Sequence, residues 1–414
     1  MSKAISRRNF LMATGAVGAA GLLAACGSKP AASSTASSAA SQAPAASADE
    51  SLALSDGPVN LSISWWGGDS RHAAYQSALE AFQAEHSNIT VEPTFAAWSG
   101  WEEKMAAAFI AGNAQDVCQV NWNWLYNYSA DGSKFVDLNT TSKFIDMTQW
   151  DAAAMDACYV ANSQQCVPVS MTGRIFYWNM TTFNKAGITE VPKSLDDLMA
   201  AGKAFQEKLG NDYYPMHLGA YDRMILMVFY LESKYGKDWA DPVTSTLNYT
   251  EEEIAEGLAF IKSLVDNHVM MNLKTYYSAN SDTATHQSNE WITGKIAGIF
   301  EWDSAASKYS SALDDSNKDG FTVGEEIKFG DNNGGFSKVS MGLAITKTCK
   351  NVAEAATLIN FLLNEEKGAS IMGSECGIPA SKAGLKFAQD AGAVKSLVAE
   401  ANAKVMAFTT NKLD

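Results

Sequence analysis

The chain has 414 residues, of which 47% are hydrophobic and 19% charged, enough for the cores of two or three domains. Its net charge of −15 repels phosphate backbones and disfavours docking on anionic lipid, so nucleic-acid binding is excluded. Six cysteines are too few for a disulfide scaffold, and no C-x-x-C pair indicates zinc. Eleven tryptophans are unusual, because six of them lie between residues 65 and 124.

The first 56 residues have the features of an export signal and a tether. Three basic residues precede an uncharged stretch, 9–25, which is too short and glycine-rich for a membrane-spanning helix. S-R-R-N-F-L at 6–11 resembles the twin-arginine export motif, and L-A-A-C, ending at Cys26, resembles the bacterial lipobox. The alternative is an ordinary apolar N-terminus with a chance cysteine. We expect a signal peptide over 1–25. We also expect a lipidated Cys26 at the start of a flexible Ser/Ala-rich tether, 26–56, which holds the protein on the extracytoplasmic face of the cell membrane.

The rest of the chain alternates predicted strands and helices. Apolar residues alternate or recur at helical spacing in the order strand 59–65, helix 73–85, strand 89–93, helix 101–110, strand 116–120. This order predicts a parallel sheet with right-handed crossovers. Later elements are strands at 174–178, 297–300 and 341–345 and helices at 194–208, 251–267 and 352–363. The predicted fold class is α/β with more than one lobe.

Four stretches carry a resemblance to one family. W-x-x-K-x-x-A-A-F-I-A-G-N-x-Q-D-V at 101–117 is followed by Y-W-N through F-N-K-A-G at 177–187, N-E-W-I-T-G-K-I-A at 289–297 and G-I-P-A at 377–380. In order and spacing they resemble the bacterial extracellular solute-binding proteins (family 1 type) of carbohydrate ABC importers. The resemblance covers nearly the whole chain from about residue 59.

The resemblance implies two α/β lobes that close over a ligand in a cleft between them. The N-lobe would be 57–170 with 337–372, and the C-lobe 171–336 with 373–414. Hinge crossings would fall near 170–173, 336 and 377–379, where Gly and Pro can absorb a bend.

The implied function is capture of a carbohydrate and delivery to an ABC importer permease. We expect an oligosaccharide ligand, a monomer, and neither catalysis nor a cofactor. A first alternative is a solute-binding protein for a polyamine, a peptide or an iron chelate. A second is an exported glycoside hydrolase, which needs two carboxyl groups about 5–10 Å apart; no such pair stands out at a strand end.

Aromatic and amide residues cluster where the first and third strands end, and this is where ligands bind in open α/β sheets. Sugar rings lie with their C–H faces on indole rings while their hydroxyls contact polar side chains. Core packing is the alternative for about half of the tryptophans. The candidates on this rim are Trp65, Trp66, Trp98, Asn121, Trp122 and Trp124.

Polar candidates are each open to a structural alternative. Asp69 and Arg71 either grip hydroxyls or cap the following helix, and Asp222 is either a ligand group or an N-cap. Arg174 either contacts hydroxyls or forms a structural ion pair. The remaining candidates are Tyr177, in a stretch that carries the resemblance, Glu301, Trp302 and Asp303, which follow a strand, and Gly335, through its backbone.

Two further patterns leave alternatives open. Asp315–Gly320 with Glu326 fits a calcium loop, but the extended stretch after it argues against an EF-hand, and a solvated turn is the alternative. The five histidines show no metal spacing, so no metal is expected. Cys158 and Cys166 flank a short loop and form either a disulfide or a pair of reduced thiols.

Overall fold

The computed structural model describes residues 52–241, 246–281, 283–409 and 411–412. The expected signal peptide, Cys26 and most of the tether lie outside these residues. No helix in the described ranges has the length and apolar character needed to cross a membrane. The described residues belong to one unit of the chain, Ala48–Asp414.

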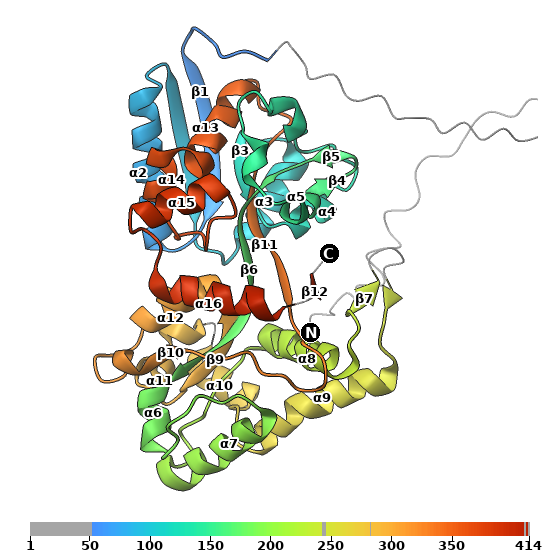
Figure 1. Ribbon diagram of the computed structural model, residues 1–414, viewed down its shortest axis with the longest axis vertical. Helices are drawn as coiled ribbons and strands as arrows, with labels where there is room; N and C mark the ends of the chain where they lie inside the picture. Colours follow the sequence, from blue (N-terminus) through green and yellow to red (C-terminus); the bar gives the residue numbers. More distant parts are fainter. Residues whose placement is uncertain (1–51, 242–245, 282, 410, 413–414) are drawn as a thin grey trace, which may run out of the picture. The chain divides into compact units, whose positions relative to one another are not determined.

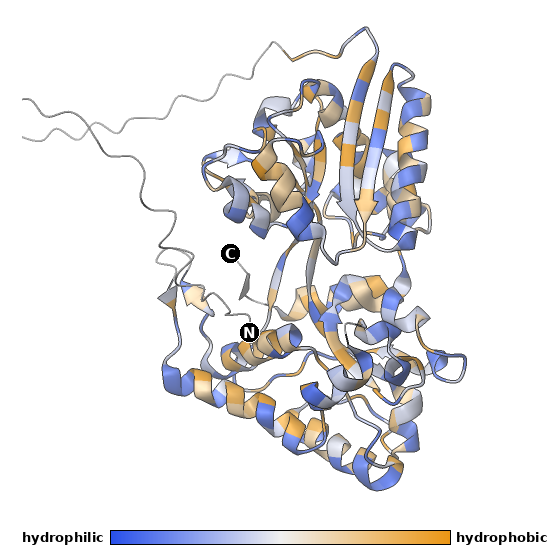
Figure 2. Ribbon diagram, turned by 180° about the vertical axis from the view of Figure 1, so that it is seen from behind, coloured by the Kyte–Doolittle hydropathy of each residue, from blue (hydrophilic) through white to orange (hydrophobic). Residues whose placement is uncertain are grey.

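The first five elements follow the predicted order. Strands β1 (Val59–Trp66), β2 (Ile89–Ala96) and β3 (Val117–Val120) are joined by α2 (Asp69–Glu85) and α3 (Trp101–Ala111). β1 pairs in parallel with both β2 and β3, so the predicted parallel sheet is confirmed. Hydrophobic and hydrophilic residues alternate along β1 and β2 (Figure 2), as expected for strands that pack on one face.

Two long strands connect the halves of this unit. β6 (Val167–Asn179) pairs antiparallel with β11 (Phe336–Ile345), and β11 pairs antiparallel with β3. Further along, β6 pairs with β9 (Gly298–Trp302) and β10 (Phe321–Val323). The sheet order is therefore β10-β6-β11-β3-β1-β2, with β9 on β6, and both long strands run from one group of elements into the other (Figure 1).

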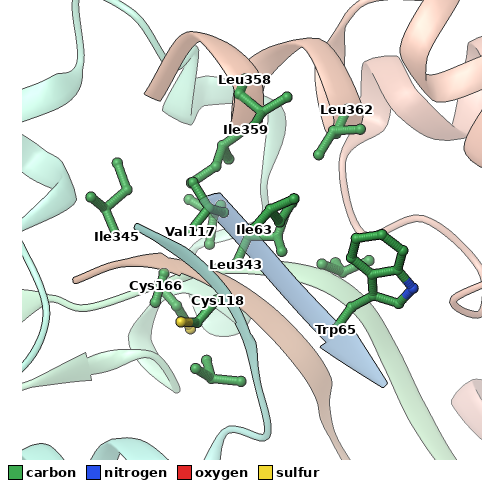
Figure 3. Packing of buried hydrophobic residues seen from close by; sticks show 14 of the residues in the cluster. Ile63, Trp65, Val117, Cys118, Cys166, Leu343, Ile345, Leu358, Ile359 and Leu362 are labelled. Carbon is green, nitrogen blue, oxygen red and sulfur yellow. The ribbon is translucent and has the colours of Figure 1, made fainter. Parts of the chain in front are cut away.

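Two main hydrophobic clusters correspond to the two lobes of this α/β fold. One gathers buried residues from 59–169 and 339–376, and Figure 3 shows part of it, with residues of β1, β3 and β11 packed beneath α13 (Val352–Asn364). The other gathers residues from 175–327 and 398–405. α15 (Lys382–Asp390) packs on α13 and on α14 (Glu366–Met372), with the first cluster, although the predicted boundary at residue 373 assigns it to the C-lobe.

The remaining elements lie around these clusters. The helices are α4 (Asn123–Ser129), α5 (Ala152–Asp156), α6 (Met180–Lys185), α7 (Leu195–Leu209), α8 (Ala220–Tyr235), α9 (Glu251–Asp266), α10 (Leu273–Asn280), α11 (Asn289–Ile292), α12 (Ala306–Ser311) and α16 (Ser396–Phe408). The 3₁₀ turns are η1 (Leu138–Thr141), η2 (Met147–Gln149), η3 (Thr285–Gln287), η4 (Asp303–Ala305) and η5 (Lys318–Gly320). The short strands are β4 (Tyr159–Val160), β5 (Ser163–Gln164), β7 (Ala240–Asp241), β8 (Thr246–Leu247) and β12 (Asn411–Lys412).

Candidate functional site

Two of the predicted stacking tryptophans are core residues. Trp65 has no exposed surface and stacks on Tyr75 and Phe95, with ring centroids 4.5 and 4.9 Å apart. Trp124 is equally buried, and its indole N–H donates to Glu102 at 3.1 Å. With no ring face open, neither residue can stack on a sugar in this structure, so the core alternative holds for both. Figure 3 shows the Trp65 indole among the packed residues of the first cluster.

Trp98 presents the open face of an aromatic cluster at this rim. Its side chain is 44% exposed, and it lies edge-on to Trp66, with ring centroids 5.2 Å apart. Trp66 and Trp122 are almost buried, and Trp122 packs edge-on against the exposed Tyr126 of α4. Trp98 and Tyr126 are therefore the residues of this cluster with surface to offer a ligand.

Asp69 and Arg71 both lie in the first turn of α2, which begins four residues earlier than predicted. Gly68 is the N-cap and no side chain caps the helix, so the capping alternative does not hold. The Arg71 guanidinium donates to the backbone carbonyls of Glu375 at 3.0 Å and Trp66 at 3.1 Å. Arg71 thus fastens the end of β1 to the segment before the last predicted crossing, a structural role.

Arg174 is a buried cation that two carboxylates neutralise. Its Nη1 lies 2.7 Å from Asp222 and 3.4 Å from Glu301, and it also donates to the Phe300 carbonyl at 3.0 Å. Asp222 lies in the first turn of α8, whose N-cap is Gly219, so Asp222 is a partner of Arg174 and not the N-cap. The structural ion pair foreseen for Arg174 is therefore present.

Trp302 at the end of β9 is contacted by two cations. The Arg174 guanidinium lies 4.3 Å from its ring centroid, and the Lys338 Nζ lies 5.0 Å from it. Lys338 belongs to β11, and its Nζ also lies 3.4 Å from Asn121 Oδ1 at the end of β3. One lysine thus links residues from the ends of β3 and β9. Trp302 itself is partly exposed.

Three other candidates have their polar groups occupied inside the protein. The buried Tyr177 hydroxyl donates to the carbonyls of Trp302 and Asp303, which positions Trp302. Asp303 is 1% exposed and accepts from the side chains of Thr172 and Asn402. The Gly335 N–H donates to Glu232 at 3.0 Å. Direct ligand contact by these three groups is not possible in this arrangement, because their hydrogen-bonding atoms are buried or already paired.

Burial changes the pKa values of several of these groups. Burial, reinforced by the charge of Arg174, lowers the pKa of Lys338 to about 8, while Asp303 opposes this. Burial also raises the pKa of Asp303 to about 6 against its hydrogen bonds from Thr172 and Asn402. Lysines whose pKa is lowered toward neutral pH in this way cluster at functional sites.

Sequence reasoning missed Lys338, Tyr126 and Tyr221. Tyr221 is 61% exposed at the start of α8, and the Arg174 guanidinium lies 5.8 Å from its ring. Its position beside Asp222 was a usable signal, as was that of Tyr126 beside the Trp122–Trp124 pair. Lys338 gave none, because a lysine between two strand residues is typical of a solvated strand face.

The residues of the possible calcium loop serve other roles. Asp315 pairs with Lys318 at 2.7 Å, and Asn317 accepts from Asn179 at 3.0 Å. Across the described ranges, no group of three or more His, Cys, Asp or Glu side chains is placed to hold a metal ion. The arrangement is that of the alternative, an Asp/Asn turn.

The cysteines of the described residues are buried free thiols. Cys158 and Cys166 are both free in this structure, so the disulfide alternative is not the arrangement observed. A hydrogen bond from the Cys166 thiol to Cys158, together with burial, raises the pKa of Cys166. Burial likewise raises the pKa of Cys118 and of Cys349 to about 12. Such thiols are protonated at neutral pH and are poor nucleophiles.

Solved structures with this fold include sugar-binding proteins. The periplasmic oligogalacturonide-binding protein of Yersinia enterocolitica, in complex with saturated digalacturonic acid, is 35% identical with a TM-score of 0.80, over 86% of this chain and 88% of that one. A periplasmic solute-binding protein of Pectobacterium atrosepticum is 33% identical with a TM-score of 0.81, over the same shares. A structure titled as a de novo designed cysteine esterase is 34% identical with a TM-score of 0.73, over 87% and 89%.

Sequence comparisons agree with the fold. Proteins of Brucella abortus and Brucella suis that are named as binding proteins are 22% identical over 210 residues, so the match spans 49% of this chain and 49% of their own length. The model of the family described as bacterial extracellular solute-binding protein matches residues 68–369. This family and its fold are those of extracytoplasmic binding proteins and not of enzymes. The chain belongs to the bacterial extracellular solute-binding protein family.

Proposed function

We propose that this protein captures an acidic oligosaccharide of the galacturonide class and delivers it to the permease of an ABC importer. The observation that carries the proposal is that two cationic side chains lie over the indole of Trp302: Arg174, which two carboxylates neutralise, and Lys338, which has no carboxylate within 4 Å among the described residues. A neutral sugar needs a stacking face and hydroxyl partners, whereas a uronic acid also carries a carboxylate that needs positive charge. The relative from Yersinia enterocolitica, which holds digalacturonic acid, supports the same class.

The exposed aromatic residues supply the stacking faces. Trp98 and Tyr126 lie in the lobe of the first hydrophobic cluster, and Tyr221 and Trp302 lie in the lobe of the second. Contacts from both lobes exist together only when the lobes close, so closure gives specificity. Several aromatic stacking faces suit a ligand that has more than one sugar ring.

The location and assembly are part of the proposal. Cys26, as the lipidated first residue of the mature chain, would anchor the protein on the outer face of the cell membrane. The segment 26–56 would be long enough to let the binding unit reach the permease. We propose a monomer, because one chain supplies both lobes.

The rival functions need groups that the structure does not favour. An esterase with a cysteine nucleophile needs an accessible thiolate, whereas the described cysteines are buried. A glycoside hydrolase needs a free carboxyl pair, whereas the carboxylates of Asp222 and Glu301 are both paired with Arg174. A polyamine site needs clustered carboxylates without neighbouring cations.

Thermal unfolding of the full chain with a panel of compounds tests the proposal. The panel holds digalacturonic acid, maltotriose, spermidine and a tripeptide, each assayed also for breakdown. A ligand at 100 times its dissociation constant stabilises the folded state by about 2.7 kcal/mol. We expect a shift with digalacturonic acid and intact sugar. A shift only with spermidine or the peptide would contradict the ligand class, and cleavage of the sugar would contradict the binding function.

A further inference from the structure

The two cations beside Trp302 differ in how far the protein already neutralises them. Arg174 has two carboxylates within 4 Å, Asp222 and Glu301. Lys338 has only neutral partners, Asn121 Oδ1 and the Val339 carbonyl, each 3.4 Å from Nζ. Within the described ranges no carboxylate lies within 4 Å of the Lys338 ammonium.

These neutral contacts do not satisfy a charged ammonium. Both lie beyond the usual 2.7–3.2 Å range of N–H···O hydrogen bonds, and Lys338 is partly buried. An ammonium group has three donors and a localised charge, and its desolvation is offset best by an anion. The Lys338 Nζ lies over the Trp302 ring, so this unpaired charge is next to the indole that we propose holds a sugar ring.

We propose that Lys338 pairs with a carboxylate of the bound sugar and so determines the preference for uronic acids over neutral sugars, with proton uptake on binding. This inference rests on the proposed function and adds the residue that selects the ligand. Arg174, whose charge is already paired with Asp222 and Glu301, is a positioning residue. Its guanidinium lies over the Trp302 ring and fixes the orientation of that ring.

Proton uptake follows from the surroundings of Lys338. The charged groups that face it are Arg174 on β6 and Asp303 in η4, and the neighbours from β3 and β9, Asn121 and Trp302, do not titrate. With a pKa of about 8, roughly half of the Lys338 side chains are neutral at pH 8. A bound carboxylate favours the ammonium form and raises this pKa, so binding at pH 8 takes up about half a proton, and affinity falls as the pH rises above 8.

Isothermal titration calorimetry of the full chain tests this. Wild type, Lys338→Met and Lys338→Arg are titrated with digalacturonic acid and with its neutral dimethyl ester, at pH 8 in buffers of different ionisation enthalpy. Lys328→Met, at an exposed lysine that follows β10, is the matched control. We expect Lys338→Met to bind the acid at least tenfold more weakly and the ester unchanged. Lys338→Arg should keep the preference for the acid without proton uptake, since arginine stays charged at this pH.

The outcomes separate the inference from the function beneath it. Tight binding of the acid by wild type and by Lys338→Met alike, or wild-type binding without proton uptake, would overturn the role of Lys338 and leave the proposed function standing. Failure of wild type to bind the acid would overturn both. If Lys338→Met does not fold, the proton uptake of wild type and its loss in Lys338→Arg still decide the question.

Discussion

At the scale of single residues, Trp98 and Trp124 show how one residue type serves two purposes at one rim. Trp124 fills the core and should be replaceable only at high cost, whereas Trp98 has an open face. We expect Trp124→Ala to lower the free energy of unfolding by about 3–5 kcal/mol, measured by urea denaturation. Trp98→Ala should lower it by about 1 kcal/mol.

Trp98→Ala should instead weaken ligand binding. Loss of an aromatic contact worth about 1–2 kcal/mol reduces the affinity for digalacturonic acid about 5- to 30-fold, measured by calorimetry. Leu258→Ala is the control, because Leu258 is a large apolar side chain that is 60% exposed in α9, a helix that carries none of the proposed site residues. Equal affinity of Trp98→Ala and the control would show that this face does not contact the sugar.

Glu326 carries a second residue-scale prediction. Both of its carboxylate oxygens are buried without a hydrogen-bond partner, and burial, with the charges of Asp303 and Glu325, raises its pKa well above the usual value. The folded state therefore favours the protonated form, and this group contributes stability below about pH 4.5 that is lost as the pH rises through its folded pKa.

Glu326→Gln removes the charge and keeps the shape. We expect a higher melting temperature than wild type at pH 7.5 and a difference that closes toward pH 4, followed by thermal denaturation across this range. Glu207→Gln is the control, because Glu207 lies in an exposed pair with Lys203 on α7 and should change little. A melting temperature for Glu326→Gln below that of wild type at pH 7.5 would contradict the prediction.

At this scale the sequence could indicate which residue types gather but not which of their faces are open. Trp65 and Trp98 are both tryptophans close to a strand end in the sequence. In the structure, Trp65 has no exposed surface, whereas Trp98 is 44% exposed. Lys338 could not be found, because its significance depends on Asn121, Trp302 and Arg174, which lie far away in the chain.

At the scale of elements, the predictions worked where one face of an element is solvated. β1 and β2 were located within a few residues because buried and exposed residues alternate along the first part of each strand. β6 was predicted only over 174–178, although it spans Val167–Asn179. Almost every residue of β6 is buried, so the period that marks a half-exposed strand is missing.

The crossing strands also depend on close backbone approach. A Cβ at Gly173 of β6 would lie 2.3 Å from Val405 Cγ1 and 2.7 Å from the Phe336 carbonyl oxygen. We expect Gly173→Ala to lower the free energy of unfolding by about 1–3 kcal/mol, measured by urea denaturation. Gly57→Ala is the control, since its new methyl group would meet only Ser55 Oγ at 3.7 Å. Equal urea midpoints for the two variants would show that a methyl group at position 173 is accommodated without strain and would contradict the prediction.

At the scale of the whole molecule, the two hydrophobic clusters and the two long strands between them are the basis of the proposed closure. Ligand contacts from Trp98 on one side and Trp302 on the other require the lobes to approach each other. Small-angle X-ray scattering should show a smaller radius of gyration with digalacturonic acid than without it. An unchanged radius with a saturating ligand would contradict closure.

The central claim is the capture of an acidic oligosaccharide, and a direct titration tests it. The full chain is titrated at pH 7 with saturated digalacturonic acid and, in parallel, with the disaccharide whose carboxyl groups have been reduced to alcohols. We predict saturable one-to-one binding of the acid, at least tenfold tighter than that of the reduced sugar. Equal affinity for the two sugars, or no heat with either, would contradict the account.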